Sequence, residues 1–331
     1  MKKVNLAVVG ATGMVGRTFL KVLEERDFPI DNFYVMASAR SAGQKLTFRG
    51  KEYVVEELTE HSFDKPIDIA LFSAGGSTSA KFAPIAAEHG VVVVDNSAQW
   101  RMDPEVPLVV PEVNPEDIRW NKGIIANPNC STIQAMVALK PLDDLLGIKR
   151  VVYSTYQAVS GAGVAGWKDL EDGLKGMPPK KFPHPIANNC LPHIDIFLEN
   201  GYTKEEMKMI WETRKILHHD QLKVTATTVR VPVFSSHSES INIEFLRPFE
   251  IEEIYDALEK APGLVVVDDP AHDKYPLAVD AAGKDEVFVG RIRRDESVDN
   301  GINIWVVADN IRKGAATNAV QIAELLVKNM E

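Results

Sequence analysis

The tetrapeptide Pro128-Asn129-Cys130-Ser131 contains the side chain best suited to covalent chemistry. An apolar run over 132–139 follows it and favours a helix, which would place the Cys130 thiol at the start of that helix. Unpaired backbone N–H groups there carry partial positive charge, so a thiol ionises more readily, and the thiolate is the nucleophile. A lone cysteine is more often a small buried hydrophobe, so the interpretation of Cys130 depends on its surroundings.

A glycine-rich turn near the N-terminus predicts a dinucleotide site. It follows an apolar segment and opens a run with helical spacing, a context in which a pyrophosphate can bind at the helix N-terminus. Gly10 permits the turn, Gly13 lets the backbone approach the pyrophosphate, and Gly16 allows close helix–strand packing. The spacing G-x-x-G-x-x-G departs from the usual G-x-G-x-x-G, and a turn without ligand is the alternative. The expected cofactor contacts here are Gly10, Thr12, Gly13, Met14, Val15 and Gly16.

The residues after the second predicted strand favour NADP over NAD. An NAD site usually has an acidic residue there for the ribose 2′-OH. This chain has Ser38, Arg40 and Ser41 and no carboxylate, and these side chains suit a 2′-phosphate. A solvated surface charge is the alternative interpretation of Arg40. Small residues after the third predicted strand would also let a cofactor lie close to the backbone, although a plain turn explains them as well: Ser73, Ala74 and Gly75.

These candidate sites require two kinds of scaffold. Strands and helices alternate over the first third of the 331 residues, which predicts a doubly wound parallel sheet with ligands beyond the carboxyl ends of its strands. After Lys149, β-rich segments predict an α+β domain with a mainly antiparallel sheet and a plausible dimer interface. We therefore expect a Rossmann-like domain over 1–129, a catalytic and dimerisation domain over 130–313, and a C-terminal helix (314–331) that packs back on the first domain.

The expected elements follow from hydrophobic periodicity and from turn residues. The predicted strands cover 4–9, 33–37, 68–72, 91–94, 123–126, 150–158, 225–234, 240–245, 264–267, 287–292 and 303–307. The predicted helices cover 14–26, 81–89, 204–217, 251–261 and 314–330.

Composition excludes several classes of function. A formal net charge of -10 argues against binding to nucleic acid or anionic membranes. No stretch is apolar for long enough to span a bilayer, so a cytoplasmic location is the default expectation. Cys130 and Cys190 form neither a disulfide framework nor a zinc motif, and Cys190 is interpreted as structural. The segment 218–220, His-His-Asp, is rejected as a metal site, and no metal is expected.

Three further polar clusters follow the tetrapeptide 128–131, and composition alone does not link them: residues 153–163, 211–217 and 228–239. Their sequence and order resemble the aspartate-semialdehyde dehydrogenase family, from the N-terminal glycine turn to the segment 310–316. Several motifs match at once, so the resemblance is specific. The segment 38–43 and the chain length look most like a Gram-positive-type bacterial branch of that family.

The resemblance implies NADP-dependent interconversion of L-aspartyl 4-phosphate and L-aspartate 4-semialdehyde plus phosphate, in lysine, threonine, methionine and diaminopimelate biosynthesis. It implies Cys130 as nucleophile through a thioester, His237 as general acid/base, and Gln157 as the residue that orients substrate. It also implies a homodimer. The remaining implied contacts are Arg230, Glu212 and Asn129 for substrate, Arg101 and Lys215 for phosphate, and Ser160, Gly161 and Asn318 for the cofactor.

Two alternatives remain. N-acetyl-γ-glutamyl-phosphate reductase has a similar fold and thioester chemistry, but its substrate does not need an ammonium-binding Glu212. A catalytically silent homologue that binds NADP is the alternative from another class. The presence of Cys130, Gln157, Arg230 and His237 argues against a silent homologue. Glyceraldehyde-phosphate dehydrogenase is a more distant mechanistic relative, which the rest of this chain does not resemble.

Overall fold

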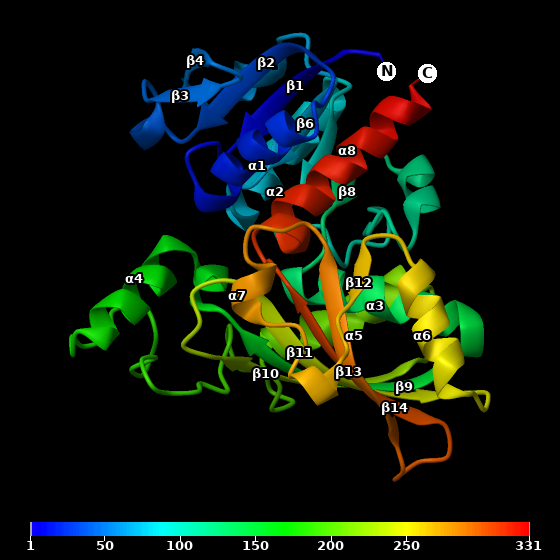
Figure 1. The fold of residues 1–331 in the computed structure, drawn as a ribbon. Helices are drawn as coiled ribbons and strands as arrows, with labels where there is room; N and C mark the ends of the chain where they lie inside the picture. Colours follow the sequence, from blue (N-terminus) through cyan, green and yellow to red (C-terminus); the bar gives the residue numbers. More distant parts are fainter. Residues whose placement is uncertain (1, 331) are drawn as a thin grey trace. The chain divides into compact units, whose positions relative to one another are not determined.

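The computed structural model describes residues 2–330, which form two compact units. Unit 1 consists of the residues up to Pro128 together with those from Ala315 onward, and unit 2 is Asn129–Gly314. Each unit has its own six-stranded sheet (Figure 1). None of the helices formed by residues 2–330 is both long enough and apolar enough to cross a membrane.

The main sheet of unit 1 is entirely parallel, as the strand–helix alternation predicts. Its order is β5-β2-β1-β6-β7-β8, so the chain starts near the centre and winds outward in both directions. The central strands β1, β6 and β7 are nearly continuous apolar runs because both faces of the sheet are covered there. The strand bounds are β1 Val4–Val9, β2 Ile30–Ala37, β5 Glu56–Glu57, β6 Ile69–Phe72, β7 Val92–Asp95 and β8 Ile124–Ala126.

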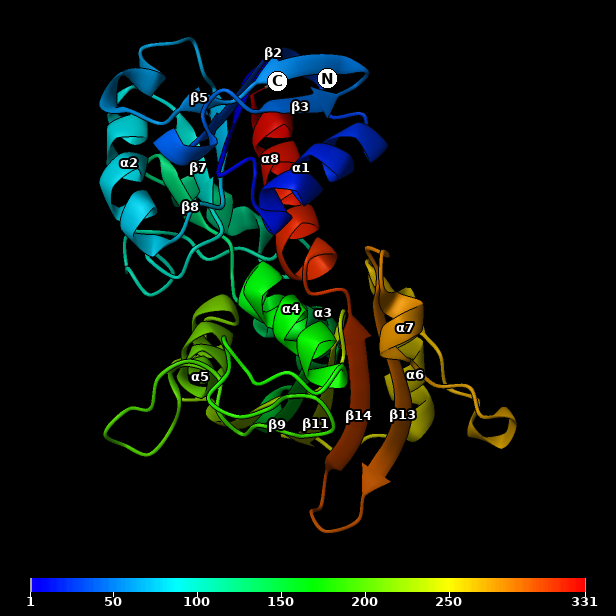
Figure 2. The same ribbon diagram turned by 90° about the vertical axis from the view of Figure 1, so that its left-hand side faces the viewer.

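Helices cover both faces of this sheet, α1 (Met14–Glu25) and α8 (Asn318–Asn329) on one side and α2 (Gly76–Glu88) on the other (Figure 2). Helix α8 belongs to unit 1, where Val320 and Ala323 join the hydrophobic core. The helix predicted over 81–89 begins five residues later than α2, which starts at Gly76. The first turn of α2 is rich in glycine and serine, which have weak helix propensity, and it forms because the helix packs on the sheet.

The sequence also missed smaller features of unit 1. An antiparallel hairpin joins β3 (Lys45–Phe48) to β4 (Lys51–Val54), and Phe33, Phe48 and Tyr53 cluster beneath it. The predicted C-terminal helix is split, because a π-helical turn (Arg312–Thr317) precedes α8. Short 3₁₀ turns lie at Ala39–Ser41, Glu60–Phe63 and Pro115–Trp120, and unit 2 has two more, at Val159–Ala162 and Pro270–His272.

The sheet of unit 2 is mixed and mainly antiparallel, which confirms the predicted class. Its order is β10-β9-β11-β14-β13-β12. Strand β10 ends at Arg230, not at the predicted Phe234, because Pro232 follows and has no N–H for a ladder. Strand β11 begins three residues before its predicted start. The bounds are β9 Ile148–Gln157, β10 Lys223–Arg230, β11 His237–Phe245, β12 Leu264–Val266, β13 Val287–Asp295 and β14 Gly301–Ala308.

Three helices pack against this sheet or against each other: α3 (Cys130–Leu146), α5 (Lys204–Ile216) and α6 (Ile251–Lys260). Helix α3 is fully buried from Ser131 to Leu139, as a central helix must be, whereas its last two turns carry Lys140, Asp143 and Asp144 and are partly exposed. Two further helices, α4 (Gly163–Leu174) and α7 (Ala278–Ala281), lie in segments predicted as connections.

Candidate active site

The register of the unit 2 sheet brings three predicted residues to one edge. Strands β9 and β10 run parallel, and their last residues, Gln157 and Arg230, are register partners. Strand β11 runs antiparallel to β9, so its first residue, His237, lies at the same edge. Parallel strand ends and the start of an antiparallel neighbour thus gather an amide, a guanidinium and an imidazole that are far apart in sequence.

Cys130 is the first residue of α3, as the apolar run 132–139 predicts. Asn129 is the N-cap, and its Oδ1 accepts the Ser131 N–H at 2.8 Å. Cys130 is not part of a disulfide, and its intermediate exposure leaves the thiol accessible to a substrate. Gly314 lies against it, because a Cβ added to Gly314 would stand 2.9 Å from the Cys130 Cβ.

His237 is fully buried and neutral. Burial lowers its pKa to about 3, and the Arg230 charge adds to this effect. Its Nδ1 accepts the Ala158 N–H at 3.0 Å, so the neutral ring carries its proton on Nε2. No side chain or backbone group within residues 2–330 is hydrogen-bonded to Nε2. This N–H is therefore available to a bound molecule.

Arg230 lies beside His237, as a Cβ added to Gly161 would stand 2.8 Å from Arg230 Nη1 and 3.3 Å from His237 Nε2. Arg230 Nη1 donates to the Ala158 carbonyl at 2.7 Å, whereas its buried Nε has no hydrogen-bond partner among the described residues. Burial lowers its pKa, and the charges of Glu205 and Cys130 oppose that shift. An anionic ligand would satisfy the unpaired donor.

Glu212 and Lys215 lie one turn apart on α5. Glu212 is buried, and its Oε2 accepts the Asn129 N–H at 2.7 Å. One carboxylate oxygen of the predicted ammonium-binding residue thus holds the backbone beside the nucleophile. Lys215 is half-buried.

Two residues that the sequence analysis missed support this edge of the sheet. Glu205 accepts hydrogen bonds from both Asn129 and Gln157. Asn310 accepts the N–H of Ser236, which precedes His237 with a left-handed φ of 72°, and contacts Ser160 Oγ. A signal for Glu205 exists in the sequence: Glu205 and Lys208 precede Glu212 and Lys215 by seven residues each, which is two helical turns on one face.

The glycine turn of unit 1 has the geometry expected of a phosphate site. Gly10 has a φ of 84°, and a Cβ on Gly16 would lie 2.1 Å from the Gly10 carbonyl oxygen, so both positions need glycine. Gly13 is the N-cap of α1 and supplies no side-chain cap, which leaves the N–H groups at Met14 and Val15 to an external acceptor.

The predicted 2′-phosphate residues lie beside that turn. Thr12 Oγ1 donates to Ser41 Oγ at 3.3 Å, and Ser38 and Arg40 belong to the same exposed turn after β2. No carboxylate lies between Ala37 and Gly43. The donors present fit a phosphate better than a ribose diol. Ser73, Ala74 and Gly75 follow β6, the neighbour of β1 in the sheet.

The other predicted contacts divide between the units. In unit 1, Arg101 is buried and donates to the carbonyls of Asn127 at 2.9 Å and Asn96 at 3.1 Å. Asn318 Nδ2 donates to Val109 O at 3.0 Å and to Asn127 Oδ1 at 2.7 Å. In unit 2, Ser160 is buried beside Asn310.

Outside these sites, Cys190 is an exposed free cysteine. Its exposure gives it no part in a core, contrary to the structural role expected from the sequence. No group of three or more histidine, cysteine or acidic side chains is arranged to hold a metal within the described part of the chain.

Two family models match the chain. The NAD binding domain of semialdehyde dehydrogenases matches residues 5–121, and the dimerisation domain of semialdehyde dehydrogenases matches residues 139–313. The chain is also 62% identical to an aspartate-semialdehyde dehydrogenase of Aquifex aeolicus, over 98% of both chains. It is 53% identical to aspartate-semialdehyde dehydrogenase 2 of Vibrio cholerae, again over 98% of both chains.

Solved structures are similar over the same length. A Vibrio cholerae aspartate semialdehyde dehydrogenase II complexed with ASA has a TM-score of 0.95 at 52% identity and covers 99% of both chains. A Candida albicans aspartate semialdehyde dehydrogenase with NADP has a TM-score of 0.80 at 28% identity and covers all of both chains.

Proposed function

Because the chain belongs to the aspartate-semialdehyde dehydrogenase family, we propose that it interconverts L-aspartate 4-semialdehyde plus phosphate with L-aspartyl 4-phosphate, using NADP. The observation that carries this proposal is the half-exposed thiol at the start of α3, beside an edge where Gln157, Arg230 and His237 meet. Flux toward the semialdehyde would serve lysine, threonine, methionine and diaminopimelate biosynthesis.

In the oxidative direction, Cys130 Sγ bonds to the aldehyde carbon, and the carbonyl electron pair moves to the oxygen. Bound NADP would supply the acceptor for the hydride that the carbon then loses. The thioester left on Cys130 is attacked by a phosphate oxygen, which expels the thiolate and gives the acyl phosphate. The partial positive charge at the start of α3 favours the thiolate in both the first and the last step.

His237 is the proposed acid/base residue, acting through Nε2. Because Nδ1 accepts the Ala158 N–H, the exchangeable proton of the resting ring lies on Nε2. His237 therefore acts first as the donor to the substrate oxygen, where charge develops when Cys130 adds. To accept the thiol proton at Nε2, the ring would have to give up its hydrogen bond from Ala158.

The charged residues suit an amino acid with a phosphate acceptor. The unpaired Nε of Arg230 supports its role as the partner of the α-carboxylate, and Gln157 is proposed to orient the reacting carbon. Glu212, with Asn129 in the adjoining wall, is proposed for the α-ammonium. Arg101 and Lys215 are proposed for phosphate, and Ser160, Gly161 and Asn318 for the nicotinamide end of NADP.

The two units then have separate proposed tasks. Unit 1 would hold NADP by its glycine turn, by Ser38, Arg40 and Ser41, and by the small residues after β6. Unit 2 would carry the chemistry and form a homodimer, which the match to a dimerisation domain supports. The Gram-positive-type branch and the cytoplasmic location stay predictions, and the Aquifex and Vibrio relatives come from outside Gram-positive bacteria.

The decisive experiment is phosphate-dependent reduction of NADP by L-aspartate 4-semialdehyde, followed by NADPH absorbance with NAD in parallel. Wild-type protein should turn over, and Cys130→Ala should not, while it still binds NADP. Turnover without phosphate would contradict the thioester route. No turnover in folded, NADP-binding protein would redirect the assay to N-acetylglutamate semialdehyde, and failure there would favour a silent homologue.

A further inference from the structure

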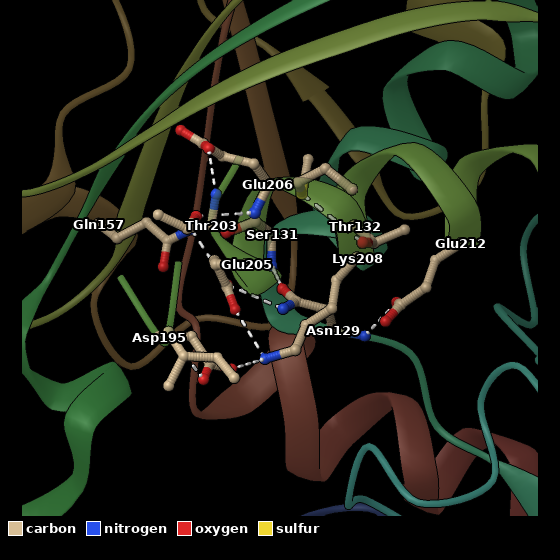
Figure 3. Close-up of polar contacts among 12 residues, drawn as sticks. Asn129, Ser131, Thr132, Gln157, Asp195, Thr203, Glu205, Glu206, Lys208 and Glu212 are labelled. Carbon is tan, nitrogen blue, oxygen red and sulfur yellow. Dashed lines mark hydrogen bonds and ion pairs between the residues drawn. The ribbon is translucent and has the colours of Figure 1, made fainter. Parts of the chain in front are cut away.

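One buried carboxylate, Glu205, connects two of the amide side chains near the nucleophile (Figure 3). It lies in the first turn of α5 with 5% of its surface exposed. Its Oε1 accepts a hydrogen bond from Asn129 Nδ2 at 2.8 Å and another from Gln157 Nε2 at 3.3 Å. The residue before Cys130 and the residue that ends β9 thus share one acceptor atom.

Lys208 neutralises this carboxylate. Its Nζ lies 3.0 Å from Glu205 Oε2 and 2.8 Å from Asp195 Oδ2. Burial alone would raise the pKa of Glu205, but the Lys208 charge and the Asn129 hydrogen bond outweigh it and lower the pKa. Glu205 is therefore an ionised acceptor, and charge-assisted hydrogen bonds of this kind are stronger than neutral ones.

The shared acceptor fixes which way each amide faces. Gln157 Nε2 is committed to Glu205 and to Thr155 Oγ1, so the nitrogen and not the oxygen of this amide meets the carboxylate. Asn129 Nδ2 is committed to Glu205, which leaves its Oδ1 to cap α3 through the Ser131 N–H. Without an anionic acceptor, either amide could turn and present a donor where an acceptor now stands.

We propose that Glu205 is a positioning residue for this reaction: its carboxylate holds the amides of Asn129 and Gln157 in their working orientation beside Cys130. Glu205 acts through those two side chains and does not touch the substrate. The expected effect of Glu205 on turnover rests on the proposed function, whereas its hydrogen bonds to Asn129 and Gln157 do not depend on it.

The next residue in the chain provides a matched control. Glu206 is also buried in the first turn of α5, where its Oε2 accepts the Thr203 N–H at 2.7 Å and its Oε1 accepts the Thr228 N–H at 3.1 Å. Its described hydrogen bonds include neither Asn129 nor Gln157. Loss of its charge should therefore affect stability without affecting the amides.

The experiment compares Glu205→Gln with Glu206→Gln. An amide at position 205 must present a donor either to Lys208 or to the two amides, so we expect kcat to fall by about 10-fold or more while the KM for NADP changes by less than about twofold. Glu206→Gln should keep kcat within about twofold of wild type. In a Gln157→Ala background, Glu205→Gln should lower kcat by a much smaller factor, because the hydrogen bond from Gln157 to position 205 is already absent.

A second readout does not need turnover. In a Cys190→Ser background, Cys130 is the remaining thiol, and its alkylation by iodoacetamide reports thiolate. Glu205→Gln removes a negative charge near Cys130, so alkylation should become faster by about threefold or more, whereas Glu206→Gln should leave it unchanged. Because unfolding would also expose the thiol and stop turnover, the comparison is made with variants whose far-UV circular dichroism and urea-unfolding midpoint match those of the wild type.

Glu205→Asp separates orientation from charge and covers the case in which Glu205→Gln does not fold. It keeps the ion pair but shortens the reach to the amides, so kcat should fall while alkylation stays at the wild-type rate. Wild-type kcat in both Glu205 variants, or an equal loss in Glu206→Gln, would overturn the proposal. If wild-type protein has no turnover, the proposed function fails, and alkylation alone decides whether Glu205 acts beside Cys130.

Discussion

The two units build their candidate sites in opposite ways. Unit 1 uses bare backbone: Gly10 and Gly16 stand where any side chain would collide with a neighbouring main chain. Unit 2 uses buried charged and polar side chains, among them Glu205, Arg230 and His237. The site in unit 1 is damaged when a side-chain atom is added to a glycine. The site in unit 2 is damaged when a side chain loses its hydrogen-bond or ion-pair partner, or when its protonation state changes.

The buried ionisable side chains of unit 2 discussed above are either paired or neutral, with one exception. A charge buried without a partner costs several kcal/mol, so a buried group must be paired or must become neutral. Glu205 is paired with Lys208 and stays ionised, whereas His237 and Glu239 have shifted pKa values that keep them neutral. The exception is Arg230, whose Nε–H has no hydrogen-bond partner among the described residues, and this is the side chain proposed to bind the α-carboxylate of the substrate.

The largest effect should come from adding one methyl group in unit 1. Gly16→Ala would put a Cβ 2.1 Å from the Gly10 carbonyl oxygen and 2.8 Å from Ala11 Cα, and backbone cannot move aside cheaply. We expect a loss of about 3 kcal/mol or more in the free energy of unfolding, or no folded protein. Urea denaturation measures this loss.

Gly13→Ala is the matched control for that prediction. Gly13 has a φ of -74°, which any residue adopts, and its added Cβ would meet only the Gly10 oxygen at 3.4 Å. The variant should unfold like wild type but bind NADP at least about 10-fold more weakly in calorimetric titration, because the methyl group stands where the pyrophosphate approaches. Equal stability losses in both variants would show that packing does not distinguish the two glycines.

The next effect tests a side chain of unit 2. Arg230→Lys keeps the charge but loses the planar fork that donates to Ala158 and leaves Nε for a ligand. We expect kcat/KM for L-aspartate 4-semialdehyde to fall about 100-fold, while NADP binding is unchanged. Arg247→Lys, at an exposed position, is the control. Steady-state kinetics that do not change would remove Arg230 from the carboxylate role.

The same contrast explains what the sequence could predict. Local sequence patterns, namely short apolar runs that alternate with helical spacing and the spacing of the glycines, predict the parallel sheet of unit 1 and the turn at Gly10. The predicted bounds of β1 match the observed ones. The start of α2 was missed because packing, not propensity, stabilises it. Cys130 was found from its helix start, and the edge formed by Gln157, Arg230 and His237 required the order of known motifs.

Glu205, Asn310 and Glu239 were missed because their roles depend on partners that are distant in sequence. Asn129 lies 76 positions before Glu205 and Ser236 lies 74 before Asn310. Only the seven-residue repeat of Glu and Lys on α5 hinted at one of them. Pairing across a fold leaves little trace in a single sequence, whereas a turn that needs glycine leaves a clear one.

The smallest effect concerns Glu239, two residues after His237 on β11. Burial raises its pKa well above 4.5, the nearby Glu205 charge adds to this shift, and Tyr153 on β9 also faces it. The folded state therefore holds a proton that the unfolded chain releases as pH rises above about 4.5, so Glu239 makes the protein less stable with rising pH. His237 has the opposite sign, since its low pKa makes the fold less stable as pH falls below 6.5.

Glu239→Gln isolates one side of this balance, because the amide is neutral at every pH. The variant should gain about 1–2 kcal/mol in the free energy of unfolding relative to wild type between about pH 5 and pH 8. Urea denaturation at the two pH values measures the gain, with Glu252→Gln at an exposed position of α6 as the control that should show none. A gain that is the same at both pH values would mean that Glu239 does not hold its proton, and the rule that unit 2 keeps only paired charges would fail at this carboxyl group.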